Sequence, residues 1–107
     1  MSSDFGFWKH GRADPEEIFD KIAEGDTSDL TSSSDVVRFR EGLLARWPDI
    51  EDSLEPSKFD LADEPDDALK YVLLTLSVRQ LDHLSEILSL AKENGLVGYS
   101  GVAGEPI

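Results

Sequence analysis

The spacing of hydrophobic residues predicts four strands. Residues 4–9 alternate two phenylalanines with glycine and tryptophan, which is the period-two pattern of a short strand. Residues 69–76 are almost all apolar and rich in β-branched and aromatic side chains, which predicts a central strand covered on both faces. Residues 96–100 are expected to form a returning strand. A weaker pattern at residues 58–62, between two prolines, predicts an edge strand.

Capping and periodicity signals predict three helices between these strands. The first opens at Asp14-Pro15, where aspartate caps and proline suits the first helical position, and it ends at Gly25. The second is capped by one of the three serines at 32–34 and stops before Pro48. The third opens with the capping box Ser77-x-x-Gln80 and closes at Asn94-Gly95.

The resulting order is strand, helix, helix, strand, strand, helix, strand. This βα(α)ββαβ order predicts a two-layer α+β sandwich of ferredoxin-like type, with a mixed or antiparallel sheet of three to four strands. Strands 4–9 and 69–76 should lie side by side in the centre, with 96–100 next to the first and the helices on one face. We expect residues 1–107 to form one domain, with 49–68 as a mobile connection and 101–107 as a loose tail.

Charge is the most unusual property of the chain. It has 23 acidic and 10 basic residues, for a formal net charge of −13. Residues 49–68 hold nine carboxylates and one lysine, and so carry eight of the thirteen excess negative charges. Because nucleic acids and anionic membranes are bound mainly through Lys and Arg, neither is an expected partner. A basic protein is a better match.

The composition also indicates where the protein works. The chain has no cysteine, which excludes disulfides and thiolate sites and is consistent with a reducing compartment. No apolar run has the length of a signal peptide or of a membrane span. We therefore expect a cytoplasmic protein.

Motifs for catalysis, cofactors or metals are missing from the sequence. The glycines near the C-terminus precede no helix, as a phosphate-binding loop requires. Residues 49–60 have the length of a calcium loop, but Leu54 stands at its obligatory glycine position and Asp60 at its final glutamate position. His10 and His83 lie on different elements, and His83 has no ligand-spaced partner except Asp82 and Glu86 on its own helix. Ser77 is explained by capping. We expect no enzyme activity, no cofactor and no metal site.

Two surfaces are candidates for binding. If the phenylalanines of strand 4–9 face the helices, Trp8 faces away, beside Tyr71 and Leu73 of the central strand. Either this apolar patch is uncovered and binds a partner, with Tyr99 as a further anchor, or the acidic connection or the tail folds over it. The second candidate is the acidic segment itself. Its candidate partner-binding carboxylates are Asp60, Asp63, Glu64, Asp66 and Asp67.

Several short motifs resemble a small bacterial family, most of whose members have no assigned activity. They are the aromatic strand DFGFWK, the helix start at Asp14 to Glu17, the Arg-Trp-Pro-Asp end of the second helix at residues 46–49, and A-x-x-x-G-L-x-x-Y at residues 91–99. Members typically follow that tyrosine with Asp-Pro, whereas this chain has Ser100-Gly101. Some similar proteins look like immunity components of bacterial toxin systems, and the resemblance implies no catalytic residue.

Two interpretations of function follow. In the first, the chain is a non-enzymatic interaction protein, for example an immunity-like inhibitor, whose acidic surface covers a basic partner. In the second, it is a small-molecule or metabolic domain that uses the open sheet face as a pocket and can form a dimer.

Overall fold

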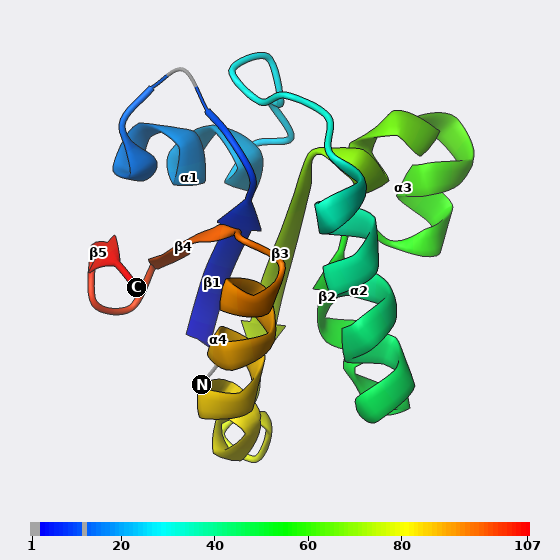
Figure 1. Ribbon diagram of the computed structural model, residues 1–107, viewed down its shortest axis with the longest axis vertical. Coiled ribbons are helices and arrows are strands. Elements are labelled where there is room, and N and C mark those ends of the chain that lie inside the picture. The colour runs from blue at the N-terminus through cyan, green and yellow to red at the C-terminus, as the bar shows by residue number, and fades with distance from the viewer. Residues whose placement is uncertain (1–2, 12) are drawn as a thin grey trace.

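The computed structural model describes residues 3–11 and 13–107, with the backbone alone of Lys58. In this part of the chain, five strands form a single antiparallel sheet in the order β2-β3-β1-β4-β5 (Figure 1). The strands are β1 (Ser3–Trp8), β2 (Leu54–Glu55), β3 (Tyr71–Leu76), β4 (Val97–Ser100) and β5 (Glu105–Pro106). The helices are α1 (Pro15–Ala23), α2 (Ser34–Arg46), α3 (Lys58–Asp63) and α4 (Leu84–Glu93), with 3-10 turns η1 (Pro48–Ser53), η2 (Pro65–Leu69) and η3 (Gln80–His83). The predicted α+β class is confirmed.

The strand register divides the sheet residues between its two faces. Phe5 pairs with Leu74 and Phe7 with Val72, and these four side chains lie in one apolar cluster. Residues directly opposite in an antiparallel pair point to the same side of the sheet, and the next pair points to the other. β1 and β3 are the two central partners and β4 pairs with the free side of β1, as the sequence predicts.

The larger part of the core lies between this first face and two helices. α2 contributes Val36, Phe39 and Leu43, and α4 contributes Ile87 and Leu90. The rings of Phe7 and Phe39 pack at 5.0 Å between centroids. The helices α2 and α4 therefore supply one layer of the domain, as predicted.

α1 packs against the opposite face of the sheet, so the expectation that all helices lie on one face is wrong. Ile18 and Ile22 of α1 are buried with Trp8, Tyr71, Leu73 and Tyr99. The backbone leaves room for this helix because β1 has Gly6 here: a Cβ at that position would lie 3.0 Å from the ring of Phe19 and 3.1 Å from Ile22. The patch expected to be either open or covered by the connection or the tail is thus covered by α1.

The acidic segment 49–68 consists of η1, β2, α3 and most of η2 rather than irregular chain. The edge strand expected at residues 58–62 is wrong, because these residues are helical and the strand that pairs with β3 is at 54–55. Ser57 and Asp60 form a capping box at the start of α3, which accounts for the helix. The mobility of the segment stays a prediction.

Most of the local signals are found where the sequence places them. Ser33 caps α2, and Gln80 and Ser77 bond each other's backbone N–H groups. Gly25 and Gly95 end their helices with φ of 85° and 68°. Asp14 precedes α1 but makes no side-chain cap hydrogen bond, which corrects its predicted role. The expected loose tail contains a turn and β5, which pairs with β4. Among the described helices, none has the length and apolar character needed to cross a membrane.

Candidate functional site

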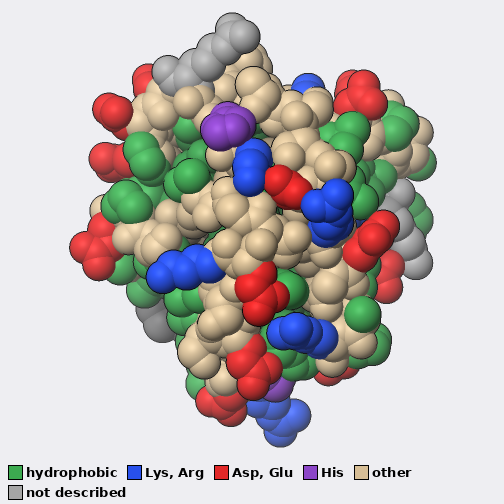
Figure 2. Space-filling view, in the orientation of Figure 1, with side chains coloured by type: hydrophobic (Ala, Val, Ile, Leu, Met, Phe, Trp, Pro, Cys, Tyr) green, Lys and Arg blue, Asp and Glu red, His purple; other side chains and the backbone are tan. Residues whose placement is uncertain are grey.

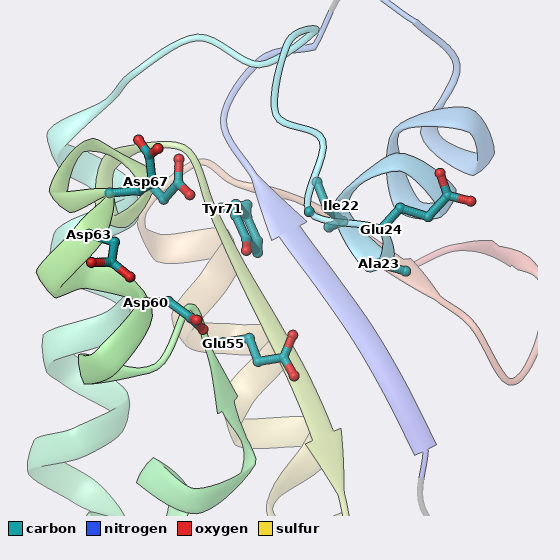
Figure 3. Close-up of a pocket in the computed structure, with 10 residues that line it drawn as sticks. Ile22, Ala23, Glu24, Glu55, Asp60, Asp63, Asp67 and Tyr71 are labelled. Carbon is teal, nitrogen blue, oxygen red and sulfur yellow. The ribbon is translucent and has the colours of Figure 1, made fainter.

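A cleft of about 500 Å³ lies between the end of α1 and the acidic segment. We call it the acidic cleft. Figure 3 shows Tyr71 near its middle, with Asp60, Asp63 and Asp67 on one side and Ile22, Ala23 and Glu24 on the other. Its lining residues are Ile22, Ala23, Glu24, Gly25, Glu55, Asp60, Asp63, Glu64, Asp67 and Tyr71. Six of these ten carry a carboxylate, and none is a lysine or an arginine.

Local structure explains how the carboxylates reach the cleft from different elements. Glu55 lies opposite Leu73 in the β2–β3 pair, and therefore on the face of the sheet that α1 covers. The capping box fixes the first turn of α3, because the Asp60 carboxylate accepts from the Ser57 N–H at 3.0 Å. Asp63 follows on the same helix and Asp67 on η2. Across the cleft, Gly25 turns the chain away after Glu24 with its positive φ.

Tyr71 lines the cleft from the first position of β3. Its side chain is 6% exposed, and its hydroxyl makes no hydrogen bond to any residue that the structure describes. Burial raises the pKa of this phenol to about 12, with the negative charges of Asp67, Glu55 and Asp60 adding to the effect. At neutral pH the hydroxyl is therefore un-ionised, with both a proton to donate and lone pairs to accept.

Two cations of the neighbouring helices, Lys21 and Arg40, are engaged or buried outside the cleft. Lys21 of α1 forms an ion pair with Asp29. Arg40 of α2 is 9% exposed, and its Nη1 has no hydrogen-bond partner among the described residues. Desolvation lowers the pKa of Arg40, and the charge of Glu51 acts in the opposite direction. Neither cation lines the cleft.

The charge of the cleft differs from that of another face of the molecule. On the face shown in Figure 2, lysines and arginines are interspersed with aspartates and glutamates. Mixed charge of this kind is typical of a solvated surface. The charged residues in the described lining of the cleft are all acidic and surround a concave space, a shape that focuses electrostatic potential.

The predicted site residues are distributed unequally between the core and the cleft. Trp8, Leu73 and Tyr99 are buried under α1, so they are not surface anchors in this structure. Tyr99 packs against Phe19 at 5.1 Å. Tyr71 is buried too but lines the cleft.

Most of the acidic residues that were predicted to bind a partner lie around the same cleft. Asp60, Asp63, Glu64 and Asp67 line the cleft, whereas Asp66 is exposed outside it. The sequence did not identify Glu24 and Glu55 as residues of this site. The signal for Glu24 was the pair Gly6 and Gly101, since a Cβ at either position would meet Phe19 of α1 and their absence permits a helix against the sheet.

Hydrolytic or metal chemistry has little support in the cleft. Its described lining residues include no serine, histidine or lysine that could act as a nucleophile or base. Among the described residues, no three His, Cys, Asp or Glu side chains are placed to hold a metal ion. The arrangement can instead accept hydrogen bonds from, and attract, an organic cation.

Comparisons of the chain with protein-family models, with curated proteins and with solved structures find no match in any of the three. The class of the molecule is therefore defined by its own geometry: an α+β domain with an antiparallel sheet and an acidic cleft between α1 and α3.

Proposed function

We propose that this protein is a non-enzymatic binding protein that recognises a basic protein through the acidic cleft. The observation that supports this most is the lining of the cleft, whose described residues include six carboxylates and no lysine or arginine. Such a surface accelerates encounter with a positively charged partner and orients it. The net charge of −13 adds a long-range attraction of the same sign.

The proposal also covers the type of fold, the cellular compartment and the biological role of the protein. The order β2-β3-β1-β4 with antiparallel neighbours supports a ferredoxin-like core formed by these strands with α2 and α4, to which α1 is added on the other face. We place the protein in the cytoplasm, where an acidic inhibitor of immunity type would cover the basic active site of a toxin. The acidic cleft and the family resemblance support this role.

The alternative, a small-molecule domain that uses an open sheet face, loses its main support in this fold. α1 covers the face on which the pocket was expected, and Trp8 is 1% exposed. We therefore do not propose it.

The proposal is tested with a cleft variant, Glu55→Gln/Asp63→Asn/Asp67→Asn. These three side chains are not used for capping, so the variant keeps the Ser57–Asp60 box. Wild-type protein immobilised at low salt should capture a specific basic protein from native lysate. The cleft variant should bind that purified protein at least tenfold more weakly in a titration, because three attractive charges are gone.

A control variant carries the same change in net charge at other positions. It is Glu41→Gln/Glu86→Gln/Glu93→Gln, three exposed residues of α2 and α4 outside the cleft. We expect it to keep affinity within about threefold of wild type, since only the long-range term changes. Equal losses in the two variants, or a captured protein that is not basic, would contradict recognition by the cleft.

A further inference from the structure

The hydroxyl of Tyr71 is a second feature of the acidic cleft, independent of its carboxylates. Tyr71 is buried to 94% of its surface, but its hydroxyl is not among the buried polar atoms that lack a partner in the described chain, so this polar end of the side chain opens into the cleft. This hydroxyl has no partner among the described residues, and its side chain lines the cleft. A ligand atom in the cleft would take the place of the water that reaches this hydroxyl.

The distribution of the carboxylates indicates the shape of that ligand. They come from α1, β2, α3 and η2 and surround a volume of about 500 Å³. No three of them converge in a metal-binding group within the described chain. Acceptors spread over this space suit an extended organic cation with several donors better than a single ion.

We propose that the acidic cleft receives an arginine side chain of the basic partner, whose guanidinium donates a hydrogen bond to Tyr71 and pairs with the surrounding carboxylates. This inference rests on the proposed function and names the group that is recognised. A guanidinium carries five donors in a rigid plane and is weakly hydrated, so it can bond to acceptors on more than one side at once. A lysine ammonium offers three donors from a point and gives up its water less readily.

The neutral state of Tyr71 is consistent with this role. Its pKa of about 12 keeps the phenol protonated at neutral pH. A phenolate would add a seventh negative charge to the cleft, whereas a phenol provides an oxygen that accepts from the guanidinium and a proton for a neighbouring carboxylate.

The test uses three probes on the intact protein: blocked hexa-arginine, blocked hexa-lysine and spermidine. Their dissociation constants are measured by calorimetry at low salt. We expect hexa-arginine to bind about fivefold or more tightly than hexa-lysine, because of its planar donors. Amide resonances of Gly25 and Tyr71 should shift on addition of hexa-arginine, whereas that of Gly98 should not.

The variant Tyr71→Phe isolates the hydroxyl, and Tyr99→Phe is its matched control. Tyr99 is equally buried but lies outside the cleft. We expect Tyr71→Phe to weaken hexa-arginine binding about tenfold, the effect of one hydrogen bond to a charged group, and Tyr99→Phe to leave it unchanged.

The outcomes separate this inference from the function on which it rests. Equal affinities for the two peptides, or an unchanged affinity of Tyr71→Phe, would overturn arginine recognition, while loss of binding in the cleft variant would still support an acidic docking site. Spermidine binding as tight as hexa-arginine at the same residues would indicate a free polyamine as the ligand and would also overturn it. No difference between the cleft and control variants would count against the proposed function itself.

Discussion

The ring and the hydroxyl of Tyr71 lie in different surroundings. Tyr71 is buried among Trp8, Ile22 and Leu73 like a core residue, yet its hydroxyl belongs to the acidic cleft. Burial and the nearby carboxylates both disfavour its ionisation, so its titration reports directly on the environment of the cleft.

Alkaline titration of Tyr71 tests this environment. In a Tyr99→Phe background, tyrosinate absorbance should rise with a midpoint near pH 12 in the folded protein, against the ordinary value of 10.0. Between these values the unfolded chain loses the proton and the folded chain keeps it. The contribution to stability is therefore complete below pH 10 and is lost as the pH rises through 12. A folded-state midpoint near 10 would show that the phenol is solvated.

At the scale of elements, α1 has two roles. Its apolar side seals the second face of the sheet, over Gly6 and against Tyr99, and its C-terminal end forms one wall of the acidic cleft. The same docking that removes Trp8 from solvent therefore also creates the cleft. Loss of this packing should therefore expose Trp8 and also disturb the acidic cleft.

The substitution Ile18→Ala tests the docking of α1. Ile18 is 2% exposed and lies in the Trp8 cluster, so its truncation should lower the free energy of unfolding by about 2–4 kcal/mol. In a Trp47→Phe background, emission from Trp8 should move to longer wavelength as water reaches the ring. Glu17→Gln, on the exposed side of the same helix, is the control. Unchanged stability and emission in Ile18→Ala would show that α1 does not seal the sheet.

At the scale of the whole molecule, charge opposes folding. The principal extents are 32 × 30 × 26 Å, and the net charge is −13. At an ionic strength of 0.01 M the Debye length is about 30 Å, so at low salt almost all of these charges repel one another. Six carboxylates around one cleft are a local excess that binding to a basic partner would neutralise.

Stability should therefore rise with salt. We expect the midpoint of thermal unfolding to increase by about 3 °C or more between 0.01 and 0.5 M NaCl, as screening reduces the repulsion. At low salt the cleft variant should be about 0.5 kcal/mol more stable than the control variant, although the two have equal net charge. At high salt the difference should disappear. A cleft variant less stable than the control at low salt would mean that these carboxylates stabilise the fold.

Local signals in the sequence identified most of the elements because each depends on a few neighbouring residues. The capping box at Ser77 and Gln80 and the glycines at 25 and 95 act within one turn of helix. The alternation in β1 likewise assigned Phe7 and Trp8 to opposite faces. Residues 58–62 alternate as a strand would, but they form a helix because the Ser57–Asp60 capping box starts one between the two prolines.

By itself, then, the sequence determined the α+β class, the neighbours in the centre of the sheet and the acidic character of residues 49–68. The side of the sheet taken by α1 was decided only in the tertiary structure, since an amphipathic helix after β1 can cover either face and the choice depends on the space over Gly6 and Gly101. That choice buried Trp8 and Tyr99, which had been candidates for binding. It also brought Glu24 opposite Asp63 and Asp67, about 40 residues later in the chain, and so formed a cleft that no local pattern records.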